Sequence, residues 1–231
     1  MRLLRLDGAI AHARLYHLQK KMEEDEGPYR LSGRSRLLMT KHIIDDRTIE
    51  ACQRGDPDAF RQVFETYKDR VYSIALCFFD GDAAAAKDIT QDVFLKLMTS
   101  ISQFQNRSHF STWLYRLVTN ACLDRKRALR RFLSFGDFRE LEVPDRRSSI
   151  EDKCIQTELE TSVRQVIAGM TPKLRMAVLL KYFEDLSYEE MAVVLGCSKG
   201  TVASRLNRAH QILARKLSHL RSLFASGEQD A

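Results

Sequence analysis

Residues 191–210, MAVVLGCSKGTVASRLNRAH, constrain the fold most strongly, because they have the spacing of a helix-turn-helix. Ala192 is a small residue at which two helices can cross, Gly196 fits a tight turn, and Val202 anchors the helix that follows. This arrangement holds the second helix away from the body of its domain, so that the helix can enter a DNA major groove. The spacing therefore predicts a DNA-binding unit near the C-terminal end of the sequence.

The second helix of this motif, predicted over residues 199–223, is basic. Six Lys or Arg and no Asp or Glu occur from Gly196 to Arg221. Recognition helices place their N-terminal residues against base edges and neighbouring groups against phosphates. The early polar residues of this helix are the candidate contacts: Lys199, Thr201 and Arg205 for base edges, Ser198 and Arg208 for phosphates, and Ser204 beside them.

Helical signals also run through the rest of the chain. Asp56-Pro57 has a helix N-cap residue before a proline at the first helical position, and a long apolar stripe follows it. A second helix is predicted over 83–102, with its apolar side chains inward. Further helices are predicted over 150–168, from Thr171-Pro172 to Phe183, and after the capping box at Ser187.

The stretch from Phe104 to Arg131 combines a polar loop, an aromatic-rich helix and a basic helix end. The helix has one apolar face, made by Phe110, Trp113, Leu114, Leu117, Val118 and Ala121. The opposite face has Arg116, Asn120, Asp124 and Arg127. Five cations, Arg125, Lys126, Arg127, Arg130 and Arg131, then lie within seven residues. Such a cluster fits either phosphate binding or an ordinary solvated helix end.

These patterns predict an all-α protein with two small helical domains joined by a flexible linker. The expected boundaries are an N-terminal extension over 1–40, a helical domain over 41–133, a linker over 134–149, a helix-turn-helix domain over 150–224 and a tail over 225–231. A later translation start at Met39 is an alternative for the extension.

Composition excludes several classes of protein. No run of about 18 apolar residues occurs, so no membrane-spanning helix is expected. The five cysteines are far apart and form no C-x-x-C pair, which favours reduced thiols in a cytoplasmic protein. No nucleophile-base set, metal-ligand cluster or glycine-rich phosphate loop is recognisable, so neither an enzyme nor a cofactor is expected.

Two motif sets in the same order resemble a known family. A helical domain ending in F-x5-F-x-T-W-L-Y-R-x3-N-x3-D-x2-R, followed by LSYEEMAxxLGCSxGTVxSRLxRA, is similar to bacterial RNA polymerase sigma factors of the sigma-70 family. The likeness is to the small two-domain extracytoplasmic-function (ECF) group, and it covers about residues 56–220.

The resemblance implies a function for each motif. The helix over 86–101 would dock on the clamp helices of the polymerase's largest subunit, through candidates Asp88, Gln91, Asp92, Phe94 and Lys96; the pattern alone fits a solvated helix face. The loop over 106–109 would capture a base flipped out of the minus 10 promoter element. The full set of minus 10 candidates is Phe104, Asn106, Arg107, Ser108, His109, Trp113, Arg116, Thr119, Asn120, Arg125, Lys126, Arg127, Arg130 and Arg131.

The same resemblance assigns the minus 35 element to the recognition helix, with candidates Ser198, Lys199, Thr201, Ser204, Arg205 and Arg208. The implied partners are the clamp helices and flap region of core RNA polymerase, promoter DNA and an anti-sigma factor. The linker would thread toward the polymerase active-site cleft, with acidic residues Asp137, Glu140, Glu142 and Asp145.

Two positions depart from the family pattern. Many relatives have arginine where this chain has Ala203 and His210, which puts in question how the minus 35 bases are read. Housekeeping sigma factors have paired tryptophans at the melting wedge, whereas this chain has Thr112-Trp113, as its group does.

Two other functions fit parts of the sequence. A stand-alone helix-turn-helix regulator would need a dimerisation surface and would leave the aromatic loop and basic helix end unexplained. A helical enzyme or signalling domain fused to a DNA-binding tail would need catalytic residues, and none can be named.

Overall fold

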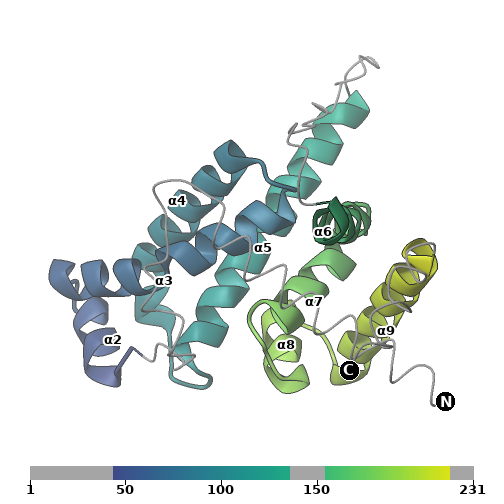
Figure 1. The fold of residues 1–231 in the computed structure, drawn as a ribbon. Helices are drawn as coiled ribbons and strands as arrows, with labels where there is room; N and C mark the ends of the chain where they lie inside the picture. Colours follow the sequence, from purple (N-terminus) through teal and green to yellow (C-terminus); the bar gives the residue numbers. More distant parts are fainter. Residues whose placement is uncertain (1–43, 136–153, 219–231) are drawn as a thin grey trace.

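The computed structural model describes residues 44–135 and 154–218, with side chains over 44–132 and 161–218. The predicted N-terminal extension, the acidic linker residues and the tail lie outside the described residues. No strand occurs within the two described ranges. The all-α prediction is therefore confirmed for this part of the chain (Figure 1). The elements, in order, are α2 (Asp46–Gln53), α3 (Pro57–Phe78), α4 (Ala83–Ser100), the short 3₁₀ helix η2 (Ile101–Gln103), α5 (Phe110–Phe135), α6 (Cys154–Ala168), α7 (Pro172–Tyr182), α8 (Tyr188–Leu195) and α9 (Lys199–Lys216).

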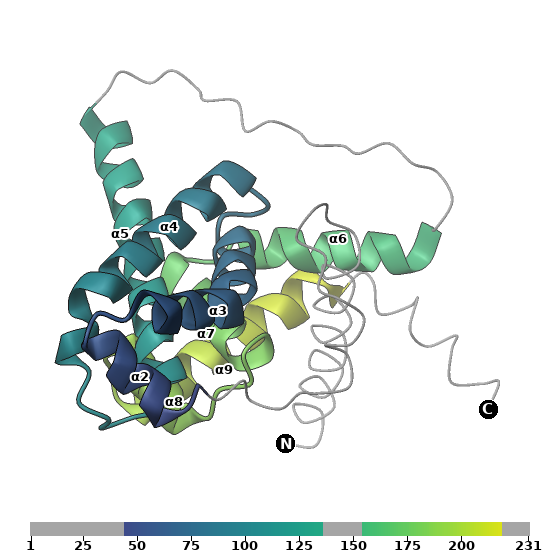
Figure 2. The ribbon, with the colours of Figure 1, turned by 90° about the vertical axis from the view of Figure 1, so that its left-hand side faces the viewer.

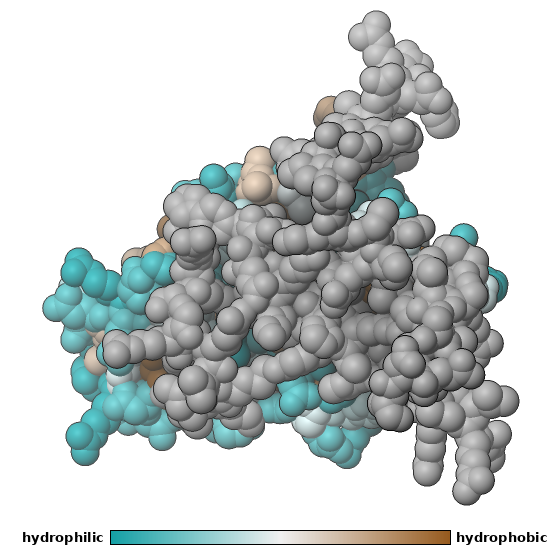
Figure 3. Space-filling model, viewed as in Figure 1, coloured by the Kyte–Doolittle hydropathy of each residue, from teal (hydrophilic) through white to brown (hydrophobic). Residues whose placement is uncertain are grey.

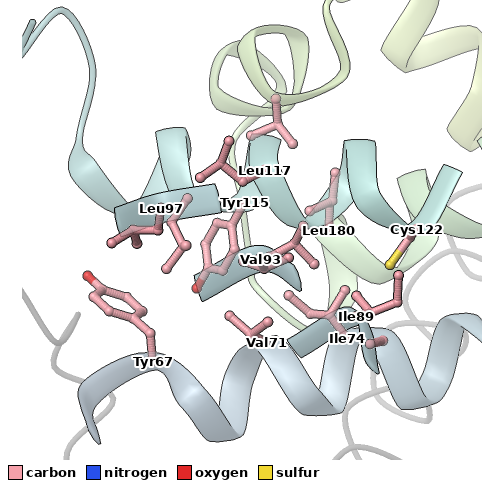
Figure 4. Close-up of a cluster of buried hydrophobic side chains, with 14 of the residues drawn as sticks. Tyr67, Val71, Ile74, Ile89, Val93, Leu97, Tyr115, Leu117, Cys122 and Leu180 are labelled. Carbon is pink, nitrogen blue, oxygen red and sulfur yellow. The ribbon is translucent and has the colours of Figure 1, made fainter. Parts of the chain in front are cut away.

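Helices α2 to α5 form the first helical unit, and α3 begins where the sequence predicts. The side chain of Asp56 accepts hydrogen bonds from the backbone N–H groups of Asp58 and Ala59, which caps the helix. The apolar stripe of α3 packs on α4 and α5, and Val63 and Val71 within it are fully buried. Figure 4 shows Val71 in this core. Burying this stripe supplies most of the stability of the helix, because isolated helices are marginal in water.

Helix α2 is a feature that the sequence analysis missed. Asp45 caps it by accepting a hydrogen bond from the N–H of Thr48 at 2.9 Å, and Ile49 and Cys52 face the core. The side-chain amide of Gln53 donates to the carbonyl oxygens of Ile101 and Phe104, at 3.2 and 2.9 Å. Helix α2 thus ties down the segment that leads into the polar loop. An N-cap aspartate before an apolar pair was the signal available.

Helices α6 to α9 form the second unit, and its caps are largely as predicted. The capping box is present, because Ser187 N–H donates to the Glu190 carboxylate at 2.8 Å and Glu190 N–H donates to Ser187 Oγ at 3.2 Å. Gly196 ends α8 in the left-handed conformation, with φ of +58°. Thr171 precedes α7, but its side chain makes no capping hydrogen bond.

The predicted C-terminal end of the recognition helix is wrong. Helix α9 ends at Lys216, not at Leu223, and the last buried residue in it is Leu213. Leu217, which directly follows the helix, packs against the Leu213 cluster but is only partly buried. Residues 219–223 of the predicted helix lie outside the described residues. The start of the helix at Lys199 agrees with the sequence analysis.

The two units share one hydrophobic core. Leu180 of α7 lies among side chains of α3, α4 and α5 (Figure 4), and Met176, Met191 and Leu206 belong to the same buried cluster. Helices α7 and α8 stand between α5 and α9 (Figure 1), and α5 packs against both α7 and α8. A view turned by 90° shows the same close arrangement (Figure 2).

The turn at Gly196 gives a direct test of the helix-turn-helix geometry. A Cβ at Gly196 would meet no atom within 4 Å, so replacement by alanine acts only through the strained positive φ. We expect Gly196→Ala to destabilise the protein by about 1 kcal/mol. Gly200→Ala is the matched control, because its Cβ would lie 3.9 Å from Ser198 Oγ, in ordinary contact, and within a helix.

Thermal unfolding followed by circular dichroism measures both variants. Gly200→Ala should be neutral or stabilising by up to about 1 kcal/mol, because alanine is the better helix former. Equal losses in the two variants would contradict a special role for the left-handed turn.

Candidate nucleic-acid interface

The polar loop between η2 and α5 rests on three aromatic rings. Phe104, Phe110 and Trp113 have ring centroids 5.4 to 5.9 Å apart. Above them, Asn106 has a positive φ of 52°, and the loop from Gln105 to His109 is largely exposed. The rings fix the base of the loop while its polar side chains remain accessible.

Phe104 itself is buried, with 6% of its surface exposed. Phe104 is one of the predicted minus 10 candidates, and in the structure its ring packs against the rings of Phe110 and Trp113. Trp113 is partly buried and keeps some accessible surface.

Helix α5 presents its whole predicted polar face, Arg116, Asn120, Asp124 and Arg127, to solvent. Arg116 and Asn120 are exposed, as the helical spacing predicts. Thr119 is 1% exposed, and its hydroxyl has no hydrogen-bond partner within the described residues. The side chain of Thr119, one of the predicted minus 10 candidates, is therefore covered in this structure.

The basic end of α5 is exposed at all five cations. Two of them pair with acids: Arg127 lies 2.7 Å from Asp124, and Arg125 lies 3.3 Å from Asp88 of α4. Exposed ion pairs of this kind contribute about 0 to 1 kcal/mol. The arginines remain available to phosphates, because replacing the carboxylate partner by a phosphate costs little free energy.

The outer face of α4 combines charge with an apolar hollow. Asp88, Gln91, Asp92 and Lys96 are exposed, as predicted, whereas Phe94 is buried and packs edge-on against Phe64 at 4.8 Å. Next to this pair is a hollow of about 220 Å³, lined by Pro57, Phe60, Arg61, Phe64, Phe94, Leu97 and Met98. The described surface seen in Figure 3 is mostly hydrophilic, with small apolar patches, so an apolar hollow between α3 and α4 is a distinct feature.

The first turns of α9 have a capped N-terminus and several exposed polar side chains. Ser198 caps the helix by accepting from the N–H of Thr201 at 3.2 Å. Lys199, Ser204 and Arg208 are exposed, and the Lys199 ammonium lies 2.6 Å from the carboxylate of Glu189. Arg205 is partly buried, with one guanidinium nitrogen 3.6 Å from the sulfur of Cys197. The Lys199–Glu189 pair is exposed, so it leaves Lys199 available to a ligand in the same way as the ion pairs of α5.

His210 points into its own domain. It shares a hydrogen bond with the hydroxyl of Tyr182, and the two ring centroids are 5.8 Å apart. Burial lowers the pKa of His210, so the ring is neutral near pH 7. Burial, with a smaller effect of Tyr188, raises the pKa of Tyr182 to about 12. Where many relatives have arginine, this chain therefore has a neutral side chain that joins α7 to α9.

Within the described ranges, no group of His, Cys, Asp or Glu is placed to bind a metal ion. None of the helices described is long and apolar enough to span a membrane. The four cysteines whose side chains are described are free thiols.

The chain has two helical units, and one of them is a capped helix-turn-helix with a basic recognition helix. This arrangement is typical of DNA-binding proteins that act in transcription. The comparison with known families is specific. Residues 63–132 match the family described as Sigma-70 region 2, and residues 160–213 match Sigma-70, region 4. The chain is 32% identical over 183 residues to the ECF RNA polymerase sigma factor SigW of Bacillus subtilis (strain 168), covering 75% of this chain and 97% of that protein.

A second relative is the ECF RNA polymerase sigma-E factor of Escherichia coli (strain K12), 30% identical over 197 residues, with 79% of this chain and 98% of that protein covered. The protein belongs to the ECF sigma factors of the sigma-70 family and is a promoter-directing sigma factor.

Solved structures share the fold. One, of CnrH in complex with the cytosolic domain of CnrY, has a TM-score of 0.55 at 21% identity and covers 75% of this chain and 96% of that one. Another, of the sigma factor RpoE from Bartonella quintana in complex with the anti-sigma factor NepR, has a TM-score of 0.54 at 23% identity, covering 69% and 96%.

The environment of His210 predicts a pH dependence of stability. Because its pKa is lower in the folded state than its ordinary value of 6.5, the unfolded chain binds a proton more readily. The stabilisation from His210 is present above pH 6.5 and is lost as pH falls below it. We expect His210→Gln to lose less stability than the wild type between about pH 7.5 and about pH 5.5.

Urea unfolding at the two pH values measures this difference. His109→Gln is the matched control, since it makes the same substitution at an exposed position in the polar loop. Identical pH dependence in wild type and His210→Gln would refute the burial effect.

Proposed function

We propose that this sigma factor binds core RNA polymerase through the outer face of α4, captures an unstacked minus 10 base in the loop over 105–109, and reads the minus 35 element with the first turns of α9. The observation that carries the proposal is the pairing of two separate nucleic-acid faces on one chain. One is an exposed polar loop on an aromatic base, and the other is an exposed, capped recognition helix. Each face suits a different DNA form.

The loop over 105–109 suits single-stranded DNA. A base that leaves the duplex loses stacking and pairing, at a cost of a few kcal/mol, which a binding loop must offset with hydrogen bonds and ring contacts. Asn106 and Ser108 offer hydrogen-bonding groups, and Trp113 offers an accessible ring nearby. Arg116 and Asn120 lie further along α5 and would meet the upstream edge of the element, with the cations of 125–131 on the backbone.

The outer face of α4 suits a protein partner with a basic and apolar surface. Asp88 and Asp92 provide charge, and the hollow at Phe64 and Met98 provides apolar area. Interfaces of this composition bury an apolar centre within a polar rim. The clamp helices of core polymerase are the partner that we assign to this face, with the flap region assigned to the second unit.

The protein acts as a specificity subunit and not as a catalyst, and it works in the cytoplasm with the polymerase. An anti-sigma factor is a further proposed partner, since the Bartonella quintana structure with the same fold contains one.

Charge reversal on α4 tests the docking assignment. We expect Asp92→Lys and Asp88→Lys together to lower the affinity for core polymerase by at least tenfold, about 1.4 kcal/mol, because charge complementarity is inverted. Asp88 also pairs with Arg125, so Asp92→Lys alone is the cleaner variant. Affinity is measured by fluorescence anisotropy with labelled sigma factor.

Glu50→Lys on α2 is the matched control, because it changes an exposed acid by the same charge on another helix. Circular dichroism checks that all variants are folded. Unchanged affinity of the double variant for core polymerase would rule out α4 as the docking face.

Truncation on α9 tests minus 35 reading. We expect Lys199→Ala and Arg205→Ala each to reduce discrimination at the minus 35 bases by about 1 to 3 kcal/mol, since each removes a candidate base-edge contact. In vitro transcription from promoters with single changes in the minus 35 element measures this. Arg215→Ala, in the last turn of α9, should leave base preference unaltered. A change confined to minus 10 preference would show that the two DNA faces are assigned in reverse.

A further inference from the structure

The last turns of α5 extend beyond the helices that pack around its first half. Residues 124–132 are all exposed, whereas Cys122, just before them, is fully buried. Figure 1 shows this end of α5 rising away from α3 and α4, and the view turned by 90° agrees (Figure 2). We call residues 124–132 the projecting end of α5. At 1.5 Å per residue it is about 13 Å long.

The apolar stripe of α5 continues into the projecting end. Leu129 follows Cys122 by seven residues, close to two turns, and so lies on the same side of the helix. Phe132 follows Leu114 by eighteen residues, which is five turns. Leu114 and Cys122 are fully buried, but Leu129 is 42% exposed and Phe132 is 79% exposed. The face that packs in the core along the first half of α5 is therefore uncovered at the projecting end.

We call Leu129 and Phe132 the apolar strip, and cations border it. Lys126 lies three residues before Leu129 and four before Arg130, so these two cations follow one edge of the strip. Arg125 lies at the base of the strip, where it pairs with Asp88 of α4 at 3.3 Å. With five cations and a single acid, the projecting end is a short, basic, amphipathic helix segment.

Binding of duplex DNA leaves the apolar strip without a role. Leu129 comes nine residues after Asn120, two and a half turns along the helix, and so lies on the opposite side from it. Arg116 and Asn120 are the candidates for the upstream edge of the minus 10 element. A phosphate backbone is bound by cations and hydrogen-bond donors. Leu129 and Phe132, on the other side of α5, add nothing to such a contact.

A surface of anionic lipids accounts for the cations and the apolar strip together. A basic amphipathic helix lies in the plane of such a surface, with its apolar side chains among the acyl chains and its cations at the headgroup phosphates. Each cation near an anionic surface raises the affinity about fivefold. Burial of Leu129 and Phe132 would also stabilise a helical segment that has few tertiary contacts.

We infer that the projecting end of α5 binds the surface of membranes rich in anionic lipids, with Leu129 and Phe132 inserted and Lys126 and Arg130 at lipid phosphates. The helix lies on the membrane and does not span it. Lys126 and Arg130 are also among the minus 10 candidates, so lipid and promoter DNA compete for them. Only this competition rests on the proposed function.

Vesicle sedimentation with the full chain tests the inference. We expect binding to vesicles of phosphatidylglycerol and phosphatidylcholine in equal parts, and at least tenfold weaker binding to vesicles of phosphatidylcholine alone, which have no net surface charge. Leu129→Ser with Phe132→Ser should weaken binding to the anionic vesicles at least tenfold, because the apolar area that inserts is lost. Lys126→Gln with Arg130→Gln should weaken it about 25-fold, about fivefold for each charge.

Matched controls change equivalent groups elsewhere on the described surface. Leu95→Ser with Val193→Ser removes two exposed apolar side chains from α4 and α8. Arg47→Gln with Arg54→Gln removes two exposed charges at α2. Both controls should bind anionic vesicles as the wild type does, and circular dichroism checks the helix content of every variant.

Four results would overturn the inference. The first is no binding of the wild type to anionic vesicles. The second is a loss in the charge variant without a loss in the apolar variant, which would show electrostatic adsorption with no insertion. The third is an equal loss in the apolar variant and its control, which would place the contact elsewhere. The fourth is weaker promoter binding of the apolar variant in the holoenzyme with unchanged vesicle binding, which would assign the strip to DNA.

Discussion

The packing of α5 on both sides is the constraint on which the rest of the structure depends. Leu114 and Cys122 are fully buried against the first unit, and Tyr115 reaches the second unit at Glu184. Because the first half of the helix is anchored on two faces, its exposed residues there are Arg116 and Asn120, whereas residues 124–132 are all exposed. The aromatic base of the polar loop and the basic end of α5 are both positioned by this anchoring.

At both DNA faces, buried residues stabilise the fold and their exposed neighbours are available to bind DNA. In the loop region, the rings of Phe104 and Phe110 provide stability while Asn106 and its neighbours stay accessible. In the second unit, Val202 and Leu206 anchor α9 in the core, and Lys199 and Arg208 project from the same helix. A sigma factor needs this division, since its DNA-reading groups must be held rigidly without being covered.

Local chemistry made much of the fold predictable. Asp56 before proline, the Ser187 capping box and the Gly196 turn depend on residues a few positions apart, so the sequence alone predicted them correctly. Helix α2 was missed although it has a local signal, because that signal is short: one N-cap aspartate, Asp45, and two buried residues, Ile49 and Cys52. Helix α9 ends at Lys216, before the predicted end, because local sequence does not specify how far a helix packs against its neighbours.

The sequence by itself determined the family, the helical nature of the chain and the identity of the polar candidates, because periodicity, caps and motif spacing are properties of neighbouring residues. Only the tertiary structure decided which candidates are accessible. It buried Phe104 and Thr119, turned His210 toward Tyr182, and joined Arg70 to Glu184 across more than a hundred residues. Burial and long-range polar contacts depend on how helices pack against one another, and no local pattern specifies that packing.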